Sequence, residues 1–84
     1  MSAVGHDLLE RITANAAIFG GKPIIRGMRI SVELVLSLLA SGASFEEILG
    51  DYPDLEREDI QACLGYARAV IANDSLDAVR IAEA

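Results

Sequence analysis

The two prolines of this 84-residue chain, Pro23 and Pro53, lie on either side of a block with helical spacing. Proline lacks a backbone donor and disfavours the helical conformation of the residue before it, so each one marks a boundary. The sequence therefore excludes one continuous helix. It predicts short helices separated by turns.

The first predicted helix begins after Ser31, whose hydroxyl can cap the free backbone donors, and runs to about Ser41. Gly42 then takes the left-handed position that ends many helices. The predicted core stripe of this first helix is Val32, Val35, Leu36 and Leu39. Leu34 and Leu38 lie off this stripe, so the helix is apolar on more than one side, which suggests a dimer.

Ser44, followed three residues later by Glu47, has the spacing of a capping box, which predicts a second, short helix ending near Asp51. Its apolar face is formed by Phe45, Ile48 and Leu49.

After Pro53, residues Asp54 and Leu55 lead into a third helix, and this segment has the clearest periodicity in the sequence. The apolar positions at helical spacing are Ile60, Cys63, Leu64, Ala67 and Ile71.

Residues 11–30 hold four basic side chains and no acid, and the run GGKPIIRGMRIS covers residues 20–31. Apolar and basic residues alternate around Gly27, which predicts a short β-hairpin or β-arm with its turn at Arg26, Gly27 and Met28. The glycines of this segment would permit such turns.

Composition agrees with a mostly α fold, because 52% of the residues are hydrophobic but only 5% are aromatic. We expect one domain over residues 1–84. It comprises a basic β-arm (11–30), a tri-helical helix-turn-helix core (31–72) that is homeodomain-like or winged-helix-like, and a C-terminal tail or short helix (73–84). In that tail, Leu76 and Val79 would face inward or the segment would fray.

The net charge of −6 has the wrong sign for binding nucleic acid, yet it is unevenly distributed. Residues 1–30 carry four basic side chains against two acids, whereas residues 31–84 carry three against eleven. Three basic residues of the arm are candidates for contacting DNA or a partner's carboxylates: Lys22, Arg26 and Arg29. The alternative is that they pair with acids of this domain, such as Glu33 or Glu47.

The third helix supplies the other candidate contacts, because Arg57, Gln61 and Arg68 share its outer face at 100° per residue. A solvated helix face is the alternative. Three acids in the first turn of this helix, Glu56, Glu58 and Asp59, would repel phosphate where recognition helices make close contact.

No catalytic, cofactor or metal site is predicted. His6 has no patterned partner, and Cys63 fits a core position better than a nucleophile. The run GGKP lacks the spacing of a phosphate-binding loop. A signal peptide and a membrane span are not expected, and we predict a cytoplasmic protein that is not an enzyme.

The run GKPxIxGxRIxV, followed by LLxxGxSxEEILxDYPxL, resembles the family called domain of unknown function 433, over about residues 11–72. This resemblance implies a small, mostly helical fold and an antitoxin similar to VapB-type proteins, with a PIN-like ribonuclease toxin as partner. The signature falls on Gly21, Lys22, Pro23, Ile25, Arg26, Gly27, Arg29, Ile30, Val32, Gly42, Glu47, Ile48, Tyr52, Pro53 and Leu55. Met28 and Glu56 stand where threonine is common.

The resulting hypothesis is an antitoxin of a type II toxin-antitoxin pair that neutralises a PIN-like toxin and, as a homodimer, represses its own operon. In it, Arg26 and Arg29 insert among the toxin's metal-binding carboxylates, with Arg68 or Arg80 as the alternative. Two other functions remain open: a stand-alone DNA-binding regulator, and a dimeric protein-interaction adaptor.

Overall fold

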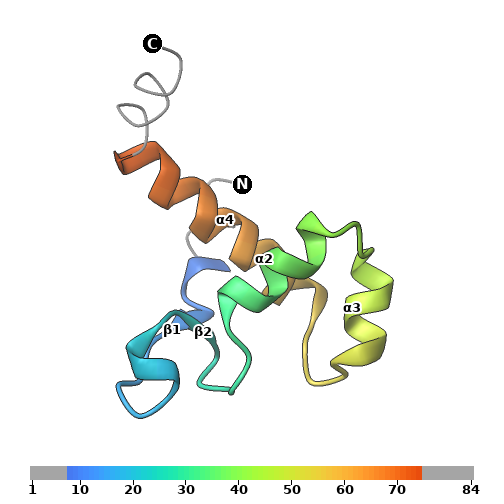
Figure 1. Ribbon diagram of the computed structural model, residues 1–84, viewed down its shortest axis with the longest axis horizontal. Helices are drawn as coiled ribbons and strands as arrows, with labels where there is room; N and C mark the ends of the chain where they lie inside the picture. The colour runs from blue at the N-terminus through green and yellow to red at the C-terminus, as the bar shows by residue number, and fades with distance from the viewer. Residues whose placement is uncertain (1–7, 75–84) are drawn as a thin grey trace.

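The structure, a computed structural model, describes residues 8–74, which form a small β-hairpin followed by three helices (Figure 1). In chain order the elements are β1 (Ile12–Thr13), the 3-10 turn η1 (Phe19–Gly21), β2 (Ile24–Ile25), α2 (Val32–Ala40), α3 (Phe45–Asp51) and α4 (Arg57–Asp74). The mostly helical fold with an N-terminal hairpin is thus confirmed. The expected tail or short helix covers residues 73–84, but α4 continues through residues 73 and 74. Residues 75–84 lie outside the described residues.

The two strands pair antiparallel, with Ile12 opposite Ile25 and Thr13 opposite Ile24. After β2 the chain reverses at the predicted place: Met28 N–H donates to the Ile25 carbonyl at 2.8 Å. Arg26 and Gly27 between them have φ of 47° and 72°, as in the tight turns that suit hairpins. Returning from this turn, Ser31 forms a single antiparallel bridge with Ile24, so β2 lies between two neighbours.

Helix α2 has the ends that the sequence predicts. The Ser31 hydroxyl accepts the Leu34 N–H at 3.0 Å. At the other end, Gly42 has φ of 98°, and the backbone N–H groups of Gly42 and Ala43 donate to the carbonyls of Leu39 and Leu38. These two bonds are the Schellman arrangement, which satisfies carbonyls that the helix leaves free.

Helix α3 also begins and ends as predicted, and both hydrogen bonds of its capping box are present. Glu47 N–H donates to the Ser44 hydroxyl at 3.1 Å, and Ser44 N–H donates to the Glu47 carboxylate at 2.8 Å. Because Glu47 is used in this cap, it is not the internal partner of a basic arm residue.

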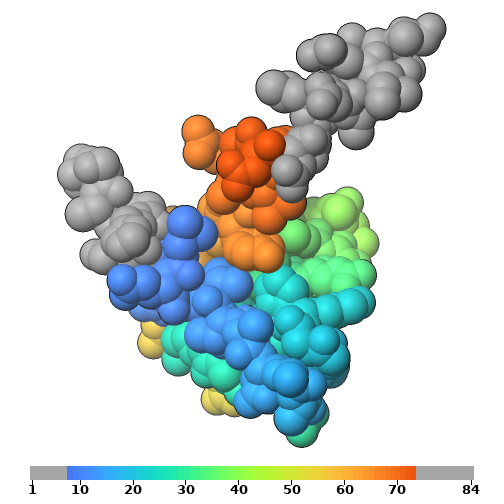
Figure 2. Space-filling view, turned by 90° about the vertical axis from the view of Figure 1, so that its left-hand side faces the viewer, coloured from blue at the N-terminus to red at the C-terminus, as the bar shows by residue number. Residues whose placement is uncertain are grey.

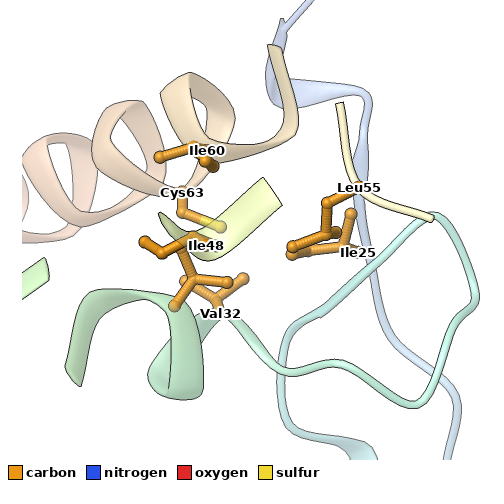
Figure 3. Close-up of a cluster of buried hydrophobic side chains, with 7 residues drawn as sticks. Ile25, Val32, Ile48, Leu55, Ile60 and Cys63 are labelled. Carbon is orange, nitrogen blue, oxygen red and sulfur yellow. The ribbon is translucent and has the colours of Figure 1, made fainter. Parts of the chain in front are cut away.

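The core lies where α2, α3 and α4 meet β2 (Figure 3). Its buried members are Ile25, Val32, Val35, Ile48, Leu55, Ile60 and Cys63. Leu36, Leu38 and Leu39 of α2 pack against this cluster. The stripe prediction holds. Of the two leucines off the stripe, Leu38 packs against the domain's own core, whereas Leu34 is half-buried and is not among the residues packed on this cluster.

Helix α4 differs from the prediction in which apolar positions it buries. Ile60 and Cys63 are buried, but Leu64 and Ile71 are 44% and 57% exposed. Leu64 is not among the residues that pack on the core cluster. Ile71 lies in the last turns of α4, the part of this helix that extends beyond the other helices (Figure 1). Ala62 is buried although the prediction omitted it.

Candidate functional site

The strongest polar cluster of the fold is centred on Asp59, in the first turn of α4. Its side chain is fully buried although it carries a carboxylate. Burying an unpaired charge is very costly, so such a group needs close partners. The chain provides them from segments 33 and 48 residues away in sequence, around Arg26 and Arg11.

Four hydrogen bonds reach the two oxygens of Asp59. The Arg26 guanidinium donates through Nε to Oδ1 at 3.0 Å and through Nη2 to Oδ2 at 2.7 Å. Arg11 Nη1 donates to Oδ1 at 2.9 Å, and the backbone N–H of Glu56 donates to Oδ2 at 2.8 Å. These bonds fill the roughly four acceptor positions of a carboxylate, so Asp59 has none left for a ligand.

Electrostatics agree with this arrangement. Burial alone would raise the pKa of Asp59, but hydrogen bonds from Arg26, the Glu56 amide and Arg11 outweigh burial and lower this pKa below its ordinary value. The pKa of Arg26 is raised, mainly by its hydrogen bond to Asp59. All three side chains are therefore charged at neutral pH.

This cluster, hereafter the Asp59 cluster (Arg11, Arg26 and Asp59), fastens three parts of the chain together. Arg11 comes from the residue before β1, Arg26 from the turn after β2, and Asp59 from α4. Arg26 also donates to the Asp54 carbonyl at 2.9 Å, in the link between α3 and α4. Its positive φ, unusual for a residue with a side chain, is held by these contacts.

From the sequence, Asp59 is grouped with Glu56 and Glu58 as acids that would repel phosphate at the start of the third helix, which requires Asp59 to face the solvent. That part of the prediction is wrong, because Asp59 is buried and neutralised by two arginines. Glu56 is bound by Arg11 at 2.7 Å, and Glu58 is exposed. The signal for burial was available: Asp59 lies four residues before Cys63, on the apolar face of the helix.

The predicted contact residues of the arm have three different surroundings. Lys22 pairs with Glu33 at 3.2 Å, as the internal alternative had it, with both side chains mostly exposed. Arg26 belongs to the Asp59 cluster. Arg29 is exposed and has no ion-pair partner among residues 8–74. Of the three, only Arg29 is a free cation.

The outer face of α4 carries the other three candidates, and all are exposed. Arg57 is not free, since it pairs with Glu46 at 3.2 Å and its guanidinium carbon lies 5.1 Å from the centre of the Phe45 ring. The side chains of Gln61 and Arg68 make no hydrogen bond or ion pair within the described part of the chain. This face therefore offers one free cation, four helix positions from the exposed Leu64.

Residues considered for chemistry are placed as follows. Cys63 is buried in the core, and burial raises the pKa of its thiol to about 12, so it is a core residue as predicted. His6 lies outside the described residues. Within residues 8–74, no group of three or more His, Cys, Asp or Glu side chains is placed to hold a metal ion. In the same range, no helix is long and apolar enough to cross a membrane.

The fold and the Asp59 cluster define a small helical domain. The ion pairs of buried Asp59 hold its β-hairpin against α4. The model of the family described as "Protein of unknown function (DUF433)" matches residues 12–67, and the chain belongs to this family. The matched region contains β1, β2, the turn at Arg26 and Gly27, and all of α2 and α3. It also contains α4 as far as residue 67, which includes the buried residues of this helix. The resemblance stated from the sequence motifs is confirmed.

One relative is "Uncharacterized protein y4eO" of Sinorhizobium fredii (strain NBRC 101917 / NGR234), which is 38% identical over 60 residues. The match covers 71% of this chain but 27% of the relative. The chain thus spans about a quarter of the length of the curated relative that it matches. No solved structure matches the chain.

Proposed function

We propose that this protein is an antitoxin that binds and neutralises a PIN-like ribonuclease. The observation that carries the proposal is that most basic side chains of the described domain already pair with its own acids. Of the six Lys and Arg residues within 8–74, four are engaged in ion pairs with the domain's own acids, and Arg29 and Arg68 are left. A surface with few free cations suits a protein partner better than a phosphate backbone.

Arg29 is the residue that we assign to the partner's carboxylates. Its neighbours Met28 and Ile30 pack against the core, so the chain is held on both sides of the exposed guanidinium. A fixed display lowers the entropy lost on binding. An arginine fork also fits a carboxylate pair, and in a PIN-like nuclease it would compete with the divalent metal for those acids.

The test is neutralisation in cells. The neighbouring reading frame is expressed with and without this protein, and growth is followed. We expect growth arrest that is relieved by co-expression, and we expect Arg29→Glu to lose this relief while Arg68→Glu keeps it. Arg26→Glu is unsuitable, because it would put a second acid beside buried Asp59 and destabilise the fold. The proposal fails if no arrest occurs or if the wild-type protein does not relieve it.

A second candidate function is a DNA-binding regulator, favoured by the helix-turn-helix layout and by the exposed outer face of α4. Gln61 and Arg68 are available there, whereas the exposed acids Asp54 and Glu58 lie near the start of the same helix. Binding to the DNA upstream of its own gene would weaken steeply as salt rises, and Arg68→Ala would reduce that dependence. Absence of binding at low salt would exclude this function and operon repression.

A further inference from the structure

An apolar groove lies between α2 and the second half of α4. Its walls come from Pro23, Val32, Leu36, Tyr66, Val70 and Ile71. Val70 is 43% exposed and Ile71 57%, although both are large β-branched side chains. This half of α4 rises above the rest of the described domain in Figure 2. Among residues 8–74, the core cluster thus ends before this half of α4, where Val70 and Ile71 are partly exposed.

An apolar surface that continues a thin core needs an occupant to remove it from water. The rim of the groove shows which occupant fits. It carries one cation and one anion, Lys22 and Glu33, which pair with each other and leave the groove electrically balanced. The exposed unpaired acids of the described chain, Asp51, Asp54 and Glu58, lie on α3 and around the start of α4, outside the groove.

Two molecules that each carry a net charge of −6 repel each other, and this repulsion is smallest when they meet through a neutral face. The groove is such a face, because Lys22 and Glu33 at its rim pair with each other. A two-fold axis through it would bring the exposed second halves of both α4 helices against apolar walls. A basic partner would instead be drawn to the acidic side of the domain.

We propose that a second copy of this chain covers the groove, so that the protein is a two-fold symmetric dimer joined through α2 and the second half of α4. The groove would then be the interface of the homodimer in the proposed antitoxin. Dimer formation requires neither the nuclease nor DNA. The groove supplies fewer residues than the 20–30 per side of a standard interface, so we expect a weak dimer whose population depends on concentration.

The experiment is sedimentation equilibrium of the purified chain alone over a wide concentration range. Wild type is expected to shift from monomer to dimer. Ile71→Glu is expected to weaken this association at least tenfold, because it puts two carboxylates into an apolar interface. Leu64→Glu is the matched control, because it adds the same charge to the same helix at an exposed Leu outside the groove. Its dissociation constant for the dimer is expected to stay within about twofold of the wild-type value.

Two further measurements keep the outcome clear. Circular dichroism should show the same helix content for both variants, since both positions are exposed. Higher salt should strengthen the dimer by screening the repulsion between two acidic chains. The proposal is overturned if wild type stays monomeric at all concentrations, if Leu64→Glu disrupts the dimer as much as Ile71→Glu, or if salt dissociates it. Failure of toxin neutralisation would leave each of these results unchanged.

Discussion

Among single residues, Asp59 has the largest predicted effect on stability. Replacing it with Asn removes the charge that holds Arg11 and Arg26, and we expect the free energy of unfolding to fall by about 3 kcal/mol. Both arginines are partly exposed, so hydration offsets part of the ion pairing that they lose with Asp59. Urea unfolding measures the change. Exposed Glu58→Gln, one position away, is the control and should stay within about 0.5 kcal/mol of wild type.

The same residue gives the fold a predictable response to acid. The pKa of Asp59 is lower in the folded protein than the value of about 3.9 in an unfolded chain. The folded state therefore binds this proton less readily, so the stabilisation is complete above about pH 5 and is lost as pH falls below about 4. Unfolding measured from pH 7 to pH 2 should show this loss in wild type. An equally steep decline in Asp59→Asn would assign it to other carboxylates.

At the scale of elements, the end of α2 depends on the backbone of Gly42. An alanine there would have to adopt φ of 98°, although its side chain would meet nothing within 4 Å. We expect Gly42→Ala to lower the free energy of unfolding by about 1–2 kcal/mol through backbone strain. Gly50→Ala is the matched control: it also has open space but lies inside α3 without positive φ, so it should be neutral or stabilising. Equal effects in thermal unfolding would contradict the assignment to backbone strain.

For the molecule as a whole, local signals in the sequence were sufficient to predict the helices. Ser31, Ser44 and Gly42 act on their own neighbours in sequence, so the boundaries of α2 and α3 follow from residue type. The Asp59 cluster was missed because it joins residues far apart, and no local pattern says which arginine meets which acid. The exposure of Ile71 was missed for a similar reason: helical spacing identifies a face, but not where the neighbouring helix ends.

The arrangement of the whole core predicts where the folded domain opens first. Ile60 and Cys63 lie where α2 and α3 pack on α4, whereas residues 70–73 of the same helix are exposed. In dilute solution, where the chain is monomeric, we expect amide hydrogens of residues 60–66 to exchange at least a hundredfold more slowly than those of 70–73, because the latter open without disturbing the core. Hydrogen exchange followed by mass spectrometry tests this, and uniform protection along α4 would contradict it. At high concentration a dimer joined through the groove would slow exchange at 70–73 while leaving α3 unchanged, so one experiment reports both the limit of the core and the surface that a second copy covers.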